Sequence, residues 1–248
     1  MSDPIELYFW PTPNGWKISI ALEEMGLPYV MKPVAIGRGD QFKPDFMAIS
    51  PNNRMPAIID PDGPGGAPIS VFESGAILQY LGRKTGKFYP SDERERVEVE
   101  QWLIWQVAGL GPMAGQASHF VNYAVKLVDD PALIEYSRAR YVNELNRLCG
   151  VMERRLADRP YLAGEYSIAD MASWPWARIA DRLGQNFGDF PKLKDWVDRI
   201  RARPAVERAL KVGEELRQKE LSKADVQQMA TSLFGQTAAS VAAATQKP

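Results

Sequence analysis

The stretch that decides the fold runs from Ser50 to Ala76 and reads SPNNRMPAIIDPDGPGGAPISVFESGA. It contains two short apolar runs, Ala57 to Asp60 and Ile69 to Phe72, and the residues between them are mostly proline, glycine and aspartate. This pattern is typical of two strands joined by a turn. The residues that follow, Ser74 to Thr85, are predicted to form a helix. The stretch therefore predicts a ββα unit.

The residues before this stretch alternate between predicted strands and helices. We expect strands over Ile5 to Phe9 and over Pro28 to Val34. A helix is expected over Lys17 to Met25 with Asn14 as its N-cap, and a weaker helix over Pro44 to Ala48. The order β-α-β-α followed by ββα indicates an α/β fold, and by itself it leaves several α/β sandwiches open.

The second half of the chain has no predicted strand. We assign residues 1–87 to the α/β domain, residues 88–93 to a linker and residues 94–218 to an all-helical domain. Residues 219–248 are rich in Gln, Ala, Ser and Thr and offer little to bury, so we expect a mobile tail or at most a loosely attached helix.

Three local patterns describe the helical half further. The stretch Gly109 to Pro112 should kink or divide the long helix that begins near residue 93. A second long helix is expected over Pro131 to Ala157. Ser167 with Asp170 three residues later approximates a capping box, which predicts the start of a further helix. A last helix is expected over Ala205 to Leu216.

The composition argues against several classes of function. The 248 residues include 30 Lys and Arg against 31 Asp and Glu, so bulk charge gives no reason to expect nucleic acid or membrane as a partner. The single cysteine, Cys149, excludes an internal disulfide, and the single histidine, His119, argues against a metal site built from histidines. We see neither a signal segment nor an apolar run of about 18 residues, and therefore expect a cytoplasmic protein.

Two features of the central stretch predict a site for a short peptide. A cis bond before Pro56 would turn the backbone outward and leave the N–H and C=O groups of Met55 for an extended ligand. Glu73 and Ser74 open a helix, whose unpaired N–H groups can hold a carboxylate. The expected ligand is a short peptide with an exposed α-carboxylate at the helix end.

These residues resemble the glutathione-binding signature of the glutathione transferases. Three further segments make the resemblance closest to the bacterial nu class, whose members reduce disulfides with glutathione: Leu7 to Gly15, Gly39 to Phe42, and Gly109 to Gln116. The resemblance covers roughly residues 5 to 212. It implies a thioredoxin-like α/β domain followed by an all-α domain, glutathione as co-substrate without a metal, and a homodimer.

The resemblance also implies roles for individual residues. Thr12 and Asn14 would stabilise the thiolate of glutathione, since only the thiolate is a good nucleophile. The residues that would bind glutathione are Gln41, Arg54, Met55, Pro56, Glu73, Ser74 and, from across a dimer, Arg140. Thr12 and Asn14 as turn and cap residues, Gln41 and Arg54 as surface residues, and Arg138 in place of Arg140 remain open alternatives.

The loop after the first strand departs from the better-known transferase classes. Their catalytic serine or cysteine stands four residues before a helical Lys or Arg, and that position here, counted back from Lys17, is Pro13. Tyr8 lies within an apolar run and is predicted to be a core residue. Cys149 is predicted to be an inert helix residue, so the thiol must come from the ligand.

Three functions remain in competition. The first is a glutathione-dependent disulfide reductase, in which bound glutathione thiolate attacks a disulfide and a second glutathione resolves the product. The second is a transferase that conjugates glutathione to small electrophiles. The third is a regulatory binding protein, because a yeast nitrogen regulator resembles the same family. That regulator carries an Asn-rich N-terminal extension, whereas the first strand is expected here by Ile5.

Overall fold

The computed structural model describes residues 3–216, 221–239 and 241. It divides into two compact units. The first comprises Met1–Ile77 with Ala209–Pro248, as far as these ranges are described, and the second comprises Leu78–Arg208. The division falls ten residues before the end of the predicted α/β domain. It also assigns the residues from Ala209 onward to the first unit.

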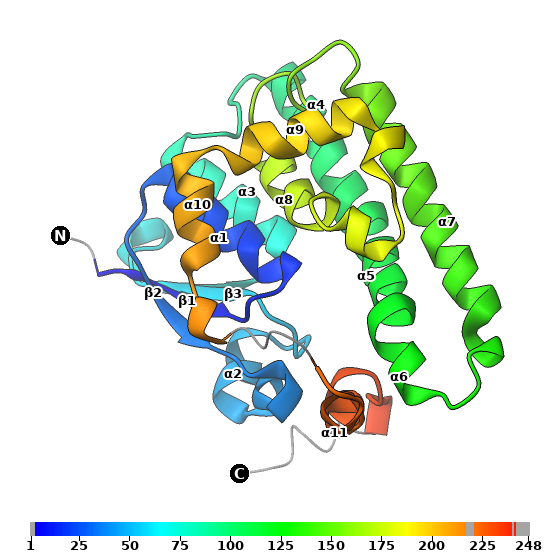
Figure 1. Ribbon diagram of the computed structural model, residues 1–248. Helices are drawn as coiled ribbons and strands as arrows, with labels where there is room; N and C mark the ends of the chain where they lie inside the picture. Colours follow the sequence, from blue (N-terminus) through cyan, green and yellow to red (C-terminus); the bar gives the residue numbers. More distant parts are fainter. Residues whose placement is uncertain (1–2, 217–220, 240, 242–248) are drawn as a thin grey trace. The chain divides into compact units, whose positions relative to one another are not determined.

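A four-stranded mixed sheet organises the first unit (Figure 1). Its strands stand in the order β2-β1-β3-β4 and are β1 (Ile5–Phe9), β2 (Tyr29–Pro33), β3 (Ala57–Asp60) and β4 (Ile69–Phe72). β1 pairs with β2 in parallel and with β3 antiparallel, and β3 pairs with β4 antiparallel. All four predicted strands are therefore present, within one residue at each end.

Helices lie against both faces of this sheet. The helices of the α/β part are α1 (Pro13–Met25), α2 (Pro44–Ile49) and α3 (Ser74–Thr85), and α1 and α2 lie on opposite faces (Figure 1). Short 3-10 turns cover Ile36–Arg38, Asp40–Phe42, Pro64–Gly66 and Glu214–Leu216. The fully buried core includes Leu7, Phe9, Ile18, Leu22 and Ile58. Burying each such side chain contributes about 1.5–3 kcal/mol to the free energy of unfolding.

The start of α1 differs from the prediction. Thr12, and not Asn14, is the N-cap residue, since its backbone is extended and its side chain accepts a hydrogen bond from the Gly15 N–H. Pro13 explains the shift, because its fixed φ angle suits the first helical position and its missing N–H costs no hydrogen bond there. Asn14 therefore lies inside the first turn of α1.

Part of the predicted tail forms a helix, which is the alternative that the sequence left open. Residues Lys223–Leu233 form helix α11, which begins with a capping box between Ser222 and Asp225. Val226 on its inner face is buried, and α11 packs on the 3-10 turn that contains Gly37. The prediction weighed the low apolar content of the whole tail, whereas one buried valine and one cap are enough to hold a three-turn helix against a neighbour. Within the predicted tail, residues 219, 220, 240 and 242–248 lie outside the described residues.

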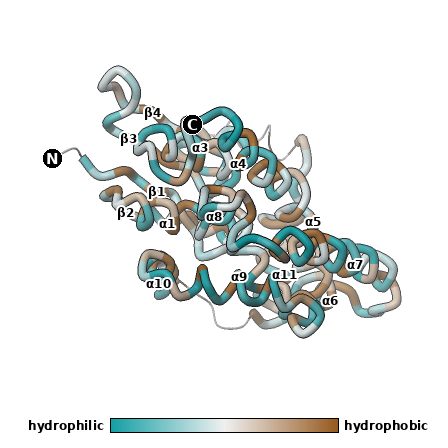
Figure 2. The backbone as a smooth tube through the Cα atoms, turned by 90° about the horizontal axis from the view of Figure 1, so that it is seen from above, coloured by the Kyte–Doolittle hydropathy of each residue, from teal (hydrophilic) through white to brown (hydrophobic). Residues whose placement is uncertain are grey.

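The second unit consists mainly of helices in its described residues, together with two isolated β-bridges, Tyr161 to Gly164 and Ala163 to Glu165. Its helices are α4 (Glu93–Trp105), α5 (Gly111–Ser118), α6 (Val125–Leu127), α7 (Ala132–Arg155), α8 (Ile168–Ala177), α9 (Pro191–Arg201) and most of α10 (Pro204–Lys211). Short 3-10 turns cover Ala180–Leu183 and Phe187–Asp189. In Figure 2, hydrophobic and hydrophilic residues alternate along α9, as expected for a helix with one buried face. The helix predicted over Ala205 to Leu216 is shorter, because Gly213 adopts a positive φ angle that ends it.

The glycine and proline stretch between α4 and α5 does not break the helix. Residues Gln106–Leu110 form a π-helical segment that joins the two helices, and a second such segment covers His119–Ala124. A π segment widens the helix by one residue, which accommodates Pro112 without an end to the chain of hydrogen bonds. The expected interruption is therefore a local change of pitch.

The predicted capping box at the start of α8 is confirmed. Ser167 accepts from the first-turn backbone, and Asp170 accepts from the Ser167 N–H at 3.1 Å. Asp170 is fully buried and also accepts from the Leu162 N–H at 3.0 Å and from Trp196 Nε1 at 2.9 Å. Burial raises the pKa of this carboxyl group to about 6, and its hydrogen bonds oppose the rise.

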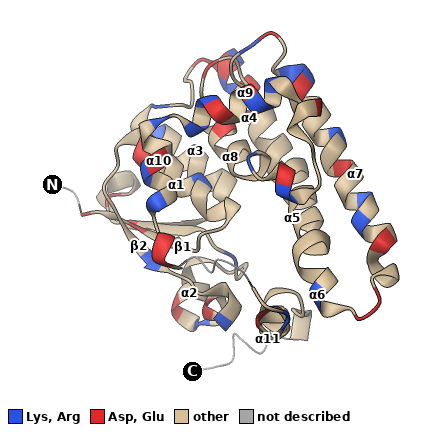
Figure 3. Ribbon diagram, in the orientation of Figure 1, with Lys and Arg blue, Asp and Glu red and all other residues tan. Residues whose placement is uncertain are grey.

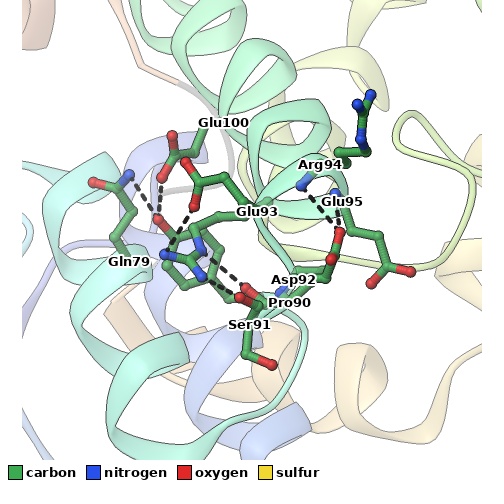
Figure 4. Close-up of polar contacts among 10 residues, drawn as sticks. Gln79, Pro90, Ser91, Asp92, Glu93, Arg94, Glu95 and Glu100 are labelled. Carbon is green, nitrogen blue, oxygen red and sulfur yellow. Dashed lines mark hydrogen bonds and ion pairs between the residues drawn. The ribbon is translucent and has the colours of Figure 1, made fainter.

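Polar contacts fix the predicted linker to α4 (Figure 4). The Arg96 guanidinium donates to the backbone carbonyl groups of Pro90, at 3.1 Å, and Ser91. Asp92 caps α4 by accepting from the Arg94 N–H at 3.0 Å.

Figure 3 shows charges of both signs along α7. Among the described residues, no helix combines the length and the apolar character that crossing a bilayer requires.

Candidate functional site

The loop after β1 brings a hydroxyl group to the N-terminal end of α1. The Thr12 N–H donates to the Trp10 carbonyl at 2.7 Å, which holds the loop in a tight bend. The Thr12 hydroxyl lies 3.8 Å from Met55 Sδ, to which it donates. A thioether is a weak acceptor, so this proton is available to a stronger one such as a thiolate. Asn14 follows two residues later, in the first turn of α1.

Tyr8 is not a competing donor for a thiolate. It is half-buried rather than a full core residue, and its hydroxyl donates to Glu6 Oε2 at 2.9 Å. Burial, helped by Glu6, raises the pKa of Tyr8 to about 12. The phenol therefore stays protonated and keeps its hydrogen bond to Glu6.

The predicted cis peptide bond between Met55 and Pro56 is confirmed. Met55 lies just before β3 and contributes its side chain to a buried cluster with Val34, Phe46 and Ala57. Among the described residues, no group hydrogen-bonds to the backbone N–H or C=O of Met55. An extended peptide can use both groups, as a strand edge does.

The start of α3 forms the second half of the site. Glu73 has a φ angle of 68°, which is uncommon for a residue with a side chain, and its carbonyl accepts the first helical hydrogen bond from Ile77 at 2.9 Å. Glu73 Oε1 accepts from Asn52 Nδ2 at 3.1 Å, which orients the carboxylate. Ser74 follows at the helix N-terminus. The arrangement presents an acid for an amine beside N–H groups for a carboxylate.

Lys17 lies at the site, although the sequence predicted no role for it there. Its side chain is 3% exposed, and its Nζ lies 3.3 Å from Ser74 Oγ. Burial lowers the pKa of this ammonium group to about 7, although Glu73 opposes the change. A signal was present in the sequence: Lys17 interrupts the run Trp16 to Leu22, of which every residue is buried.

Gln41 and Arg54 occupy different environments. Gln41 is 1% exposed, and Nε2 donates to the carbonyl groups of Ile36 at 3.1 Å and Ser232 at 3.3 Å. Both amide hydrogens are thus engaged, so the side chain has no donor left for a ligand carboxylate. Arg54 is exposed, and no described residue forms an ion pair with its guanidinium. Its carbonyl accepts from Ser50 Oγ at 2.8 Å, which holds the loop before Pro56.

Two family models match this chain. The model of the glutathione S-transferase N-terminal domain matches residues 12–84, and that of the glutathione S-transferase C-terminal domain matches residues 134–204. The two matches together cover more than half of the chain. The chain belongs to the glutathione transferase family. This membership confirms the predicted fold, a thioredoxin-like domain followed by an all-α domain.

Several glutathione transferase relatives cover most of the chain. The disulfide-bond oxidoreductase YfcG of Escherichia coli (strain K12) is 50% identical over 208 residues, which is 83% of this chain and 94% of that protein. The disulfide-bond oxidoreductase YghU of the same strain is 38% identical over 219 residues, covering 83% and 73%. A glutathione transferase structure from Pseudomonas putida, with one glutathione disulfide bound per subunit, has a TM-score of 0.78 and 44% identity, covering 84% of this chain and 91% of that chain.

The remaining predicted residues lie in the helical domain of this glutathione transferase. Arg140 is exposed on α7, 3.8 Å from Glu144 Oε2, whereas Arg138 forms a close ion pair with Glu135 at 2.6 Å. Cys149 is buried in α7, and burial raises its pKa to about 12. No group of three metal-binding side chains is found within residues 3–216, 221–239 and 241.

Proposed function

We propose that this glutathione transferase reduces disulfides with glutathione. The proposal rests on one observation, the chemistry of the hydrogen-bond donor expected beside the glutathione sulfur. Thr12 offers a neutral hydroxyl whose hydrogen, among the described residues, is donated to a thioether, and its contacts with Trp10, Gly15 and Met55 include no acid. Such a site stabilises a thiolate modestly and does not protonate a leaving group. It suits thiol–disulfide exchange, in which the leaving group is itself a thiolate.

The binding mode follows from the two halves of the site. The cysteinyl residue of glutathione pairs with the free backbone groups of Met55, beside Pro56. Its γ-glutamyl α-carboxylate binds the N-terminus of α3 and Ser74, and its amino group binds Glu73. The exposed Arg54 guanidinium is available for the glycyl carboxylate. Gln41 contributes by fixing the loop and not by direct contact.

The reaction balances with two glutathione molecules. The bound glutathione thiolate attacks one sulfur of the substrate disulfide, forms a mixed disulfide and expels the other half as a thiolate. A second glutathione thiolate attacks the glutathione sulfur of the mixed disulfide, so that glutathione disulfide forms and the second half leaves. Solvent protonates both thiolates. Since Cys149 has a pKa of about 12, the chain supplies no thiol of its own. A cytoplasmic setting, which keeps glutathione reduced, suits this chemistry.

The proposal is tested by comparing two reactions at equal glutathione. Reduction of bis(hydroxyethyl) disulfide should be much faster than conjugation of glutathione to chlorodinitrobenzene. Replacing Thr12 and Asn14 by alanine should lower the rate of reduction by about 10–100-fold, in the range of lost thiolate stabilisation. Asn122→Ala, which removes an exposed amide in the second unit, is the control. Faster conjugation would make the protein a conjugating transferase, and normal reduction by the double variant would refute the role given to Thr12 and Asn14.

We further propose a homodimer in which Arg140 reaches the glutathione of the partner subunit. The support is that the ion pair of Arg140 with Glu144 is long and the Arg140 side chain is exposed, so little energy is lost when the guanidinium changes partner. Arg138, with its shorter ion pair, is the matched control. Arg140→Ala should raise KM for glutathione more than Arg138→Ala does. A monomer in sedimentation experiments would refute this arrangement.

A further inference from the structure

Lys17 is an ionisable residue that has no role in the disulfide reduction proposed above. It extends from α1 and is nearly inaccessible to solvent, yet it lies against the start of α3. Burying an ammonium group is unfavourable unless a counter-charge or several hydrogen bonds compensate. The lowered pKa of Lys17, about 7, has burial as its main cause. The attraction of Glu73 offsets the effect of burial only in part.

The position of the ammonium group gives it a function at the helix end. Lys17 Nζ lies 3.3 Å from Ser74 Oγ, and because an ammonium has no acceptor, the hydroxyl oxygen must accept. The hydroxyl hydrogen of Ser74 then points away from Lys17 and is free to donate. A carboxylate placed at the N-terminus of α3 would receive this hydrogen and the field of the buried charge together.

We infer that Lys17 is a positioning residue, which turns the Ser74 hydroxyl toward the γ-glutamyl α-carboxylate of glutathione and supplies that carboxylate with a buried counter-charge. The inference rests on the proposed binding mode. In this arrangement Glu73 binds the amino group of the γ-glutamyl residue, whereas Lys17 and Ser74 stabilise its α-carboxylate. Lys17 itself does not touch the reacting sulfur.

The test uses two ligands without a thiol, so that thiolate formation does not enter. They are S-methylglutathione and its analogue that lacks the γ-glutamyl α-carboxylate. By calorimetry, Lys17→Met should weaken S-methylglutathione binding by about ten-fold, the effect of one charge-assisted hydrogen bond, and leave the affinity for the analogue unchanged. Lys192→Met, which removes an exposed lysine, should alter neither. Lys17→Arg keeps the charge and should restore part of the affinity.

The pH dependence gives a second measurement. A bound carboxylate favours charged Lys17, so binding takes up a proton and the wild-type affinity for S-methylglutathione should fall as the pH rises above about 7. The ligand amine and Glu73 are the other ionisable groups at this end, and both remain in Lys17→Met, which should show a flatter profile. An equal loss for both ligands, an unchanged affinity, or an unchanged profile overturns the inference. If wild type fails to bind S-methylglutathione, it is instead the proposed function that fails.

Discussion

Lys17→Met should make the protein more stable although it weakens ligand binding. The pKa of Lys17 falls from 10.5 in the unfolded chain to about 7 in the folded protein, because burial disfavours the charged form. This difference of about 3.5 units corresponds to about 5 kcal/mol, at about 1.4 kcal/mol per unit. Methionine fills nearly the same volume without a charge. The gain is an upper limit, since the variant also loses the hydrogen bond to Ser74, which contributes about 1 kcal/mol.

The size of the effect depends on pH in a defined way. Below about pH 7 the lysine is charged in both the folded and the unfolded state, so the full penalty of burial is present. Between about pH 7 and 10.5 the unfolded state binds more protons than the folded state, and the wild-type protein gains stability as the pH rises. The advantage of Lys17→Met should therefore shrink from about 5 kcal/mol at about pH 6 to about 2 kcal/mol at about pH 9.

Denaturant unfolding at several pH values measures this difference directly. Lys192→Met serves as the control, because its side chain is exposed and its removal should change stability by less than about 0.5 kcal/mol at each pH. The reasoning is refuted if Lys17→Met is less stable than wild type at about pH 6, or if its advantage does not change with pH. Either result would mean that polar groups around Lys17 compensate for its burial.

Three further substitutions test other parts of the structure. Cys149→Ser should leave turnover unchanged, because this buried thiol with a raised pKa takes no part in the reaction, and a loss above about ten-fold in a folded variant would contradict that. Val226→Asp should undock α11 and remove about 2 kcal/mol or more of protection from its amides in hydrogen exchange, whereas exposed Gln227→Asp should not. Asp170→Asn should lower the free energy of unfolding by about 3–5 kcal/mol in denaturant titrations, since it turns an NH2 group toward donors such as Trp196; a loss below 1 kcal/mol would refute this.

Elements that depend on the local sequence pattern could be predicted from the sequence. All four strands, the helix Ser74–Thr85 and the capping box at Ser167 follow from short-range rules of spacing and capping, and the structure contains each of them. The N-cap of α1 was misplaced by two residues because Pro13 and Thr12 both offer helix-start signals. The cis bond before Pro56 was also predicted, because of the type of site that the neighbouring residues resemble.

Contacts between residues far apart in the sequence could not be predicted from local sequence patterns. Lys17 lies 57 residues from Ser74, and nothing in the local sequence reveals that the two side chains meet. The close approach at Gly37 is similar: a Cβ atom there would lie 2.6 Å from Met229 Cε, the end of a flexible side chain, and the two meet because α11 packs on this turn. Such contacts depend on which surfaces the fold brings together, so they appear only in the three-dimensional structure.

Gln41 shows how the structure can change the role expected for a side chain. The resemblance implies a role for Gln41 in glutathione binding, and in the structure its carbonyl accepts from Asn53 Nδ2 at 3.3 Å, in the loop before Met55. Its amide hydrogens, however, bind Ile36 and Ser232, and Ser232 belongs to α11. The residue therefore connects the C-terminal helix to the loop before Met55. Since an amide with both hydrogens engaged cannot also donate to a ligand, we expect Gln41 to affect glutathione affinity through the position of that loop.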